Sequence, residues 1–225
     1  MLYIVATPIG NLEDITLRAL QTLKEVDFIA CEDTRHTKIL LDRYKIQKPL
    51  ISYHQHTKVQ KIDYLISLLR KGKNIALVCD AGTPGIDDPG SVIIAKAYKE
   101  KIKIVPIPGP SSLSVALSVC GFLTQRFLFL GFLPKKKGRQ TLLKNIKSSA
   151  ENIDAKIIVL FESPYRILKT FTDLKNYLGD CEVTVCRELT KKFEEIFRGR
   201  LSDAILRYTV QKPKGEFTII IKLDN

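Results

Sequence analysis

The chain has 225 residues, 45% of them hydrophobic, which is enough for one large domain or two small ones and excludes a disordered chain. Lys and Arg number 36 against 24 Asp and Glu, for a net charge of +12. This excess favours a polyanion such as nucleic acid, although many basic proteins bind none. We predict a cytoplasmic location, because MLYIVATPIG lacks the basic start of a signal peptide and no stretch is apolar enough to cross a membrane.

The cysteines form no C-x-x-C pair. An odd, unpatterned set predicts free thiols in a reducing compartment rather than a disulfide framework. The five residues are Cys31, Cys79, Cys120, Cys181 and Cys186.

Short β-rich runs alternate with helical segments in the first half of the chain, which predicts a parallel α/β sheet covered by helices. The first helix should bury a stripe formed by Leu17, Leu20, Leu23 and Val26. The predicted strands cover 2–6, 27–32, 50–54, 74–79 and 103–107, and the predicted helices cover 16–26, 37–44, 59–72, 91–101 and 111–121.

The second half of the chain has a different pattern. Four strand-like runs, at 126–133, 155–162, 182–189 and 216–223, and a helix at 165–179 predict a mixed or antiparallel α+β domain. Residues 104–125 carry no charge, so we place the domain boundary there, in a segment expected to be buried. The predicted domains are residues 1–120 and 121–225, and the positive excess is larger in the second.

Three unusual loops follow strands of the first domain: TPIGN at 7–11, DAGTPGIDDPG at 80–90 and PGPSS at 108–112. Glycine lets the backbone approach a ligand, and ligands of open α/β sheets bind beyond the carboxyl ends of the strands. We therefore expect a ligand site, although each loop alone could be an ordinary turn. Neither G-x-x-x-x-G-K-[ST] nor G-x-G-x-x-G is present, which argues against ATP hydrolysis and an ordinary dinucleotide fold.

Eight motifs follow one another along residues 2 to 223: LYIVATPIGNLEDIT, CEDTRHTKILL, CDAGTPGIDDPG, VPIPGPSSL, FLFLGFLPKKKGRQ, FESPYRI, RELTKKFEEIFRG and KGEFTIII. Together they resemble the ribosomal RNA small-subunit methyltransferase I family of the tetrapyrrole-methylase superfamily, with Cys79 and Asp87 standing where the family usually has Ser. The resemblance implies two α/β domains with S-adenosylmethionine in the cleft between them, a homodimer, and methylation of a cytidine ribose 2′-hydroxyl in the decoding region of 16S rRNA, within the 30S subunit.

The resemblance also implies a set of cofactor-binding residues. Gly82, Thr83 and Pro84 stand where the superfamily contacts the methionine part of the cofactor, with Ile86 at the offset of a second contact. Asp80 has an equal alternative, which is to cap its own loop. The full set is Pro8, Gly10, Asp80, Gly82, Thr83, Pro84, Ile86, Ser111, Ser112, Glu162, Ser163, Gly215 and Glu216.

Basic residues in two further motifs are candidates for RNA phosphate contact, with a solvated loop as the alternative. Arg35 follows Glu32 and Asp33 at the end of the second predicted strand and is a further candidate. The others are Lys135, Lys136, Lys137 and Arg139 in LPKKKGRQ, which we expect to form a loop, and Arg187, Lys191 and Lys192 in RELTKKFEE.

The catalytic base is not identifiable from the sequence, and Glu162, Glu188 and Lys191 are weak candidates. His54 and His56 would share one face of a strand, but no further ligands accompany them, so we predict no metal. Two alternatives to an rRNA methyltransferase stay open: a tetrapyrrole methyltransferase of the same superfamily, and a non-catalytic module for RNA binding or ribosome assembly. Three loops suited to a cofactor argue against the non-catalytic module.

Overall fold

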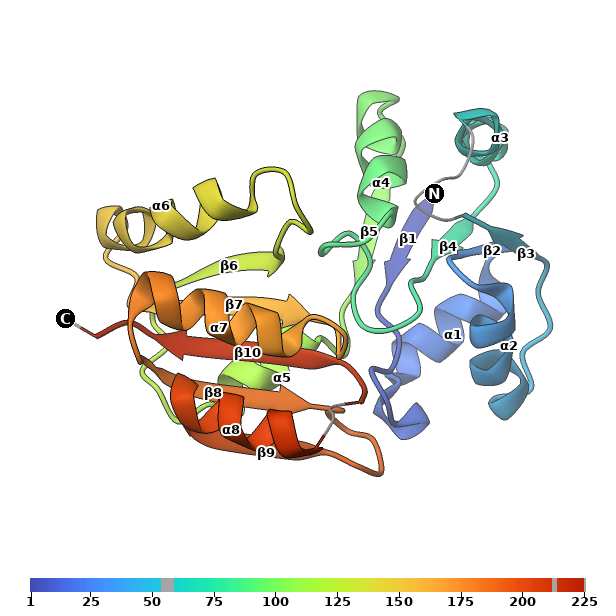
Figure 1. Cartoon of the computed structure of the whole chain (residues 1–225). Helices are drawn as coiled ribbons and strands as arrows, with labels where there is room; N and C mark the ends of the chain where they lie inside the picture. Colours follow the sequence, from blue (N-terminus) through green and yellow to red (C-terminus); the bar gives the residue numbers. More distant parts are fainter. Residues whose placement is uncertain (54–58, 212–213, 225) are drawn as a thin grey trace. The chain divides into compact units, whose positions relative to one another are not determined.

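The computed structural model describes residues 1–53, 59–211 and 214–224 (Figure 1). The chain divides into two compact units, Met1–Ser111 and Ser112–Asn225. This division falls before the boundary predicted at residues 120 and 121, because the helix that follows Ser111 packs on a strand of the second unit. None of the helices in the described part of the chain is long and apolar enough to cross a membrane.

The first unit contains a five-stranded sheet in the order β3-β2-β4-β1-β5, in which every pair of neighbours is parallel. The alternation of strands and helices in the sequence predicted this sheet, and the prediction is confirmed. Its strands are β1 (Leu2–Val5), β2 (Phe28–Cys31), β3 (Leu50–Ser52), β4 (Ile75–Leu77) and β5 (Ile104–Ile107). Its helices are η1 (Leu12–Asp14), α1 (Leu17–Glu25), α2 (Thr34–Arg43), α3 (Val59–Arg70) and α4 (Gly90–Lys99).

Helices cover both faces of this sheet, because successive side chains of a strand point to opposite faces. Val5 and Ala76 face α1 and α2 in one buried cluster. Leu2, Ile4 and Ile75 face α3 and α4 in the other. The unit therefore has three layers, and its loops emerge at the two ends of the sheet.

The buried stripe of α1 agrees with the predicted one except at Leu17. Leu23 and Val26 are buried and Leu20 packs against the same cluster, whereas Leu17 is 86% exposed. The helix also buries Ala19 and Thr22, which the prediction left out because it counted only large apolar side chains.

The second unit contains a mixed sheet in the order β6-β7-β10-β8-β9. Strands β6 and β7 are parallel, and the other neighbours are antiparallel. The mixed sheet confirms the predicted fold class. Its strands are β6 (Phe127–Phe132), β7 (Ile157–Glu162), β8 (Glu182–Arg187), β9 (Glu195–Arg200) and β10 (Phe217–Lys222), and its helices are α5 (Ser112–Val119), α6 (Arg139–Asn152), α7 (Ile167–Leu178) and α8 (Leu201–Gln211).

One face of the second sheet carries most of the core of this unit. Helices α6, α7 and α8 pack there over alternate residues such as Val183, Val185 and Ile219. Helix α5 contacts β10. Thr184 alternates along β8 with Val183 and Val185, which face the other helices. Its hydroxyl donates to the Cys120 carbonyl oxygen, just beyond the end of α5 (2.8 Å). Thr184 therefore fixes the C-terminal end of α5 to the sheet.

The uncharged segment 104–125 is not buried as a whole, contrary to expectation. Only Ile107, Ala116 and Cys120 are buried within it, and Leu123 is 91% exposed. An absence of charge therefore did not indicate burial here.

We expect Thr184→Val to lower the free energy of unfolding by about 2 kcal/mol, because the Cys120 carbonyl oxygen would lose its buried donor. Thr209→Val is the matched control, since Thr209 is exposed and its hydroxyl donates to the Ile205 carbonyl oxygen within α8, so its loss should change stability by less than about 0.5 kcal/mol. Urea unfolding of both variants measures the difference. Equal stabilities would mean that the Thr184 hydrogen bond contributes nothing.

Candidate functional site

The three glycine- and proline-containing loops meet at one edge of the first sheet. They follow β1, β4 and β5, and β1 lies between the other two strands. Thr7 and Gly82 exchange two backbone hydrogen bonds, with N–H···O distances of 2.9 and 3.0 Å. The Thr7 hydroxyl also donates to the Cys79 carbonyl oxygen (3.0 Å). The first two loops are therefore joined by backbone.

Gly82 lies where all three loops come together. Its φ of +84° is in the left-handed region that favours glycine. A Cβ atom on Gly82 would lie 3.5 Å from Ile9 Cγ2 of the first loop and 3.9 Å from Ser111 Cα of the third. The Thr83 hydroxyl donates to the Pro110 carbonyl oxygen (3.1 Å). The structure thus brings Gly82, Thr83 and Ser111 together, as expected for loops at one sheet edge.

The remaining predicted cofactor residues of these loops differ in exposure. Pro8 and Pro84 are buried. Their rings restrict φ and so fix the backbone of the two loops. Ile86 is 39% exposed, and Gly10 is exposed. Helix α5 begins at Ser112, so Ser111 directly precedes it.

Asp80 connects this edge to the loop after β2. Its carboxylate accepts the backbone N–H of Asp33 (3.1 Å), so it joins two loops. Asp33 in turn begins α2 by accepting the N–H of Arg35 (2.8 Å). The Arg35 guanidinium is exposed and forms an ion pair with Asp33 (2.6 Å), so an RNA phosphate would compete with that carboxylate for Arg35.

Glu32, Asp80 and Asp88 place negative charge at the same edge of the sheet. Burial raises the pKa of Glu32, and the charges of Asp80 and Asp88 raise it further. One Asp88 oxygen accepts the N–H groups of Gly85 (2.9 Å) and Gly90 (2.7 Å). Its other oxygen is buried without a hydrogen-bond partner among the described residues. The edge therefore favours a cationic group.

Sequence reasoning missed Asp88, although it lies in one of the three loops. The spacing of Asp88 from Gly85 and Gly90 could have indicated it. An aspartate that accepts both of these N–H groups through one carboxylate oxygen keeps its second oxygen available for another donor. No group of three or more His, Cys, Asp or Glu residues that could hold a metal occurs in the described ranges. His54 and His56 lie outside the described residues.

Glu162 of β7 is buried within a polar network of the second unit. Its carboxylate accepts the Thr170 hydroxyl (2.6 Å) and the N–H of Ser163 (2.9 Å). Arg166 forms an ion pair with it at 3.4 Å. Arg139 then donates to the Thr170 hydroxyl oxygen (2.9 Å). These contacts occupy the Glu162 carboxylate and disfavour it as a mobile base.

Glu188 and Lys191, in the loop after β8, form a second cluster with Glu216, which directly precedes β10. The Glu188 carboxylate accepts the Lys191 ammonium (2.8 Å) and the N–H of Glu216 (3.0 Å). Burial alone would raise the pKa of Glu188, but these hydrogen bonds outweigh it and the pKa is lowered. Burial would lower the pKa of Lys191, but Glu188 and Glu216 outweigh it and the pKa is raised. Both groups are therefore charged at neutral pH and poorly suited to take up a proton.

Gly215 makes room for this cluster. A Cβ atom on Gly215 would lie 2.3 Å from Glu188 Cγ, and its φ is +91°. Glu188 itself has a φ of +50°, which ends β8 at Arg187. The predicted strand 182–189 therefore stops short, and the unpredicted strand β9 begins at Glu195.

The basic candidates do not form one loop. Lys135, Lys136 and Lys137 are exposed, whereas Arg139 is 5% exposed and begins α6. The Arg139 guanidinium pairs with Asp173 (2.8 Å). Its predicted place in an exposed loop is wrong, because that carboxylate and Thr170 draw it into the protein.

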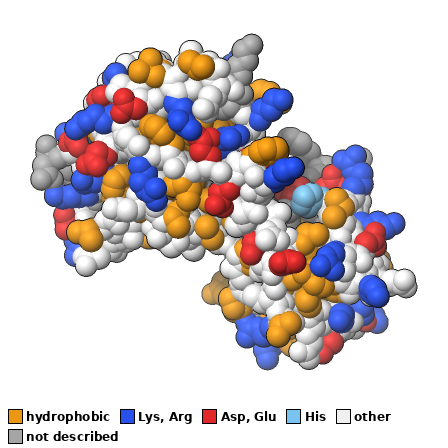
Figure 2. All heavy atoms as spheres, turned by 90° about the horizontal axis from the view of Figure 1, so that it is seen from below, with side chains coloured by type: hydrophobic (Ala, Val, Ile, Leu, Met, Phe, Trp, Pro, Cys, Tyr) orange, Lys and Arg blue, Asp and Glu red, His pale blue; other side chains and the backbone are white. Residues whose placement is uncertain are grey.

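The candidates after β8 are divided as well. Lys192 is exposed, while Arg187 pairs with Glu195 (2.8 Å) and Lys191 with Glu188. Figure 2 shows basic and acidic side chains interspersed on one face rather than one continuous basic patch. Among the predicted RNA contacts, all of which the structure describes, the three consecutive lysines and Lys192 form no ion pair. All five cysteines are free and buried, as the free-thiol prediction required.

Comparisons with known proteins agree on one family. Residues 1–205 match the model of the tetrapyrrole (corrin/porphyrin) methylases. A ribosomal RNA small subunit methyltransferase I from Thermotoga maritima is 48% identical over 98% of this chain and 97% of the relative. Another, from Bacillus subtilis, is 44% identical over 100% of this chain and 76% of the relative.

Solved structures share the fold at low identity. Cobalt precorrin-4 methyltransferase has a TM-score of 0.72 at 19% identity, over 98% of this chain and 94% of that chain. Uroporphyrin-III C-methyltransferase from Thermus thermophilus, complexed with S-adenosylhomocysteine, has a TM-score of 0.68 at 17% identity, over 97% of this chain and 96% of that chain.

We expect Glu32→Gln to raise stability at pH 7 and to leave it unchanged at acidic pH. A carboxyl whose pKa is raised on folding holds its proton more tightly in the folded state, so the wild type loses stability as pH rises above the ordinary glutamate pKa of about 4.3. The amide removes that loss. Thermal melts across pH measure it, with Glu13→Gln, an exposed acid of the same unit, as the control for losing one charge. A Glu32→Gln curve parallel to that of wild type would contradict this assignment.

Proposed function

Because the chain belongs to the ribosomal RNA small subunit methyltransferase I family of the tetrapyrrole methylases, we propose that it transfers a methyl group from S-adenosylmethionine to RNA. The acceptor in this proposal is the ribose 2′-hydroxyl of a cytidine in the decoding region of 16S rRNA, within the cytoplasmic 30S subunit, and the enzyme is a homodimer. The observation that carries the proposal is the joining of three Gly/Pro loops around Gly82 in a chain 48% identical to a named rRNA methyltransferase.

The chemistry of the loop residues fits the cofactor. S-adenosylmethionine supplies an electrophilic methyl group on a sulfonium and also carries an ammonium, a carboxylate and a ribose. The carboxylates of Glu32, Asp80 and Asp88 favour the positive charges of the cofactor. Their negative charges already act on one another, since Asp80 and Asp88 raise the pKa of Glu32. The hydroxyls of Ser111 and Ser112 and the backbone at Gly82 offer hydrogen bonds at close range.

The chain contributes to the reaction mainly by placing the two reactants. Methyl transfer is an in-line displacement, for which alignment and exclusion of water supply much of the rate. Glu162, Glu188 and Lys191 are held in ion pairs. Their contacts support roles in shaping the protein around the substrate more than a role as base. In this proposal Glu162, Ser163, Gly215 and Glu216 are the cofactor contacts of the second unit, as the family resemblance implies.

The direct test is methylation of small-subunit rRNA by the purified protein, given as free 16S rRNA and as 30S subunits, with 2′-O-methyl sites mapped by nucleotide. We expect one methylated cytidine. Methylation of a porphyrin precursor but of no RNA would replace the proposal with a small-molecule methyltransferase, and absence of cofactor binding would leave only an RNA-binding module.

We expect Gly82→Ala to abolish cofactor binding measured by calorimetry, and methylation with it. Alanine at positive φ is strained by about 1 kcal/mol, and its methyl group would occupy the space between the three loops. Gly72→Ala is the matched control, because Gly72 has a similar φ of +81° with nothing within 4 Å of a Cβ. Both variants should lose similar stability, and only Gly82→Ala should lose the cofactor. Equal cofactor affinity in the two variants would remove Gly82 from the site.

We expect replacement of Lys135, Lys136 and Lys137 by alanine to weaken RNA binding and flatten its salt dependence. Each lost phosphate contact reduces the log–log slope by roughly 0.7 to 0.9, so three contacts give about 2 to 3. The control replaces Lys24, Lys99 and Lys103, which are exposed in the first unit. Anisotropy across a salt series measures both slopes, and equal slopes would assign the three lysines to a solvated loop.

Arg139→Ala should instead lower stability by about 3 kcal/mol, because Asp173 would lose its partner.

A further inference from the structure

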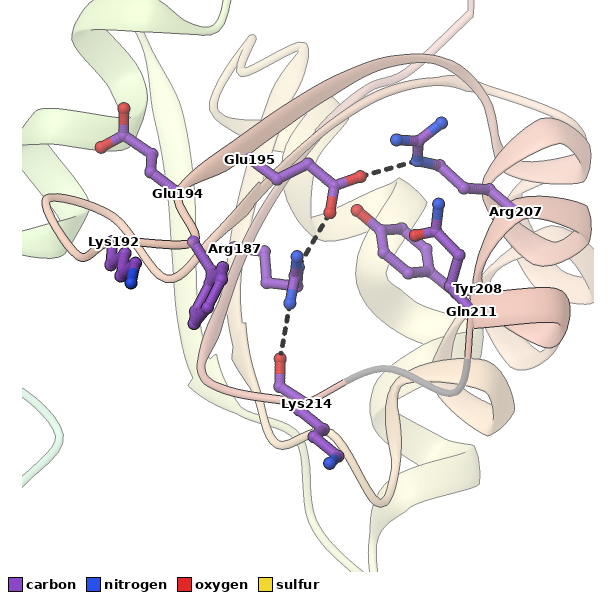
Figure 3. A pocket seen from close by; sticks show the side chains of 9 residues that line it. Arg187, Lys192, Glu194, Glu195, Arg207, Tyr208, Gln211 and Lys214 are labelled. Atoms are coloured by element: carbon purple, nitrogen blue, oxygen red, sulfur yellow. Dashed lines mark hydrogen bonds and ion pairs between the residues drawn. The ribbon is translucent and has the colours of Figure 1, made fainter.

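A pocket in the second unit combines cations, an exposed aromatic ring and a buried hydroxyl. Its volume is about 630 Å³, within the range of small-ligand sites, roughly 300 to 1,000 Å³. Its walls come from the ends of β8 and β9, from α8 and from Lys214 (Figure 3). Four basic and two acidic side chains line it, which leaves a positive excess. None of the residues assigned to the cofactor lines this pocket.

Glu195 fixes two guanidinium groups at the pocket wall. Its carboxylate accepts Arg187 at 2.8 Å and Arg207 at 2.6 Å, as the dashed lines of Figure 3 show. Arg187 also donates to the Lys214 carbonyl oxygen (3.2 Å). Burial would raise the pKa of Glu195, but the two arginines outweigh it and the pKa is lowered. The guanidiniums are thus positioned in advance, and each has N–H groups beyond those given to Glu195.

Tyr208 of α8 presents a hydroxyl group to the pocket. Its ring packs in the core against Phe217 and Phe171, with centroids 5.5 and 5.9 Å away. The residue is 0% exposed, and its hydroxyl lies beside Glu195 and Arg207 without a well-aligned hydrogen bond to any described residue. An unsatisfied buried hydroxyl is unfavourable. A ligand oxygen in the pocket would satisfy it.

Phe193 lines the same pocket and is 67% exposed. The Lys192 ammonium lies 5.7 Å from the centre of its ring. An exposed aromatic ring beside a lysine is suited to stack a nucleobase while the cation attracts the adjoining phosphate. The pocket therefore has a separate group for each part of a nucleotide.

We propose that this pocket holds one unpaired nucleotide of the RNA substrate, with its phosphate against Arg187, Arg207 and the Tyr208 hydroxyl and its base on Phe193. The nucleotide is a second contact, apart from the cytidine that receives the methyl group. The proposal rests on the proposed function in that RNA is the substrate. A base stacked on Phe193 must be unpaired, so the pocket selects single-stranded over duplex RNA.

The test measures binding of a fluorescent single-stranded fragment of the 16S rRNA decoding region, with the cofactor analogue S-adenosylhomocysteine present. We expect Phe193→Ala to weaken binding about tenfold, while Phe193→Tyr, which keeps the ring, binds like wild type. Tyr98→Ala is the control, because Tyr98 is 78% exposed on α4 of the first unit. The same fragment annealed to its complement should lose the effect of Phe193→Ala.

Tyr208→Phe separates a ligand contact from a structural one. The change removes only the hydroxyl, so we expect an unchanged or higher melting temperature together with about tenfold weaker RNA binding. A lower melting temperature would show that the hydroxyl has a partner within the protein and would overturn its assignment to a ligand.

Three outcomes would overturn the pocket itself. The first is RNA affinity equal to that of wild type in both Phe193→Ala and Tyr208→Phe. The second is a loss of RNA affinity in Tyr98→Ala equal to that in Phe193→Ala. The third is that the two pocket variants bind cytidine monophosphate more weakly while their RNA binding is unchanged. The last result would assign the pocket to free nucleotides. If wild type binds and methylates RNA while the variants bind as tightly, only the pocket fails. If wild type binds no RNA, the proposed function fails with it.

Discussion

Two backbone hydrogen bonds between Thr7 and Gly82 hold the loops after β1 and β4 together. Both loops leave neighbouring parallel strands, so they begin side by side, and the bridge fixes their distance beyond the sheet together with the bond from the Thr7 hydroxyl to the Cys79 carbonyl oxygen. The loop after β5 is added through Thr83 and Pro110. Because the contact is made by backbone, it depends on the positive φ of Gly82 more than on the identity of Thr7. The local geometry of the three loops rests on this one bridge.

In the second unit, buried polar side chains join the ends of neighbouring elements, whereas in the first unit backbone hydrogen bonds join the loops. Glu162, Thr170, Arg139 and Asp173 form one chain of contacts, and the ends of β7, α6 and α7 are joined by it. Buried charges of this kind tolerate little displacement, since any unpaired member is destabilising. A carboxylate in such a chain serves better to fix its surroundings than to exchange a proton with a substrate.

Much of the fold was predictable because it follows from periodicity. The alternating strands and helices of the first unit and the Gly/Pro loops behind β1, β4 and β5 are local signals. The position of Arg139 was not, because its partner Asp173 lies 34 residues away in sequence. Strand β9, with the sequence EIFRGR, was missed because charges at both ends mask its alternation. The pocket at Tyr208 depends on a hydroxyl that lacks a partner, a property that appears only once the helix is packed on the sheet.

Glu188 and Gly215 limit how this family member can change over evolutionary time. The Glu188 side chain fills the space that a Cβ on residue 215 would need. A substitution at 215 therefore requires the Glu188 side chain to move, which a shorter residue at 188 would make unnecessary. The positive φ at 215 still favours glycine or asparagine afterwards. The cost of a change at 215 thus depends on which residue stands at 188.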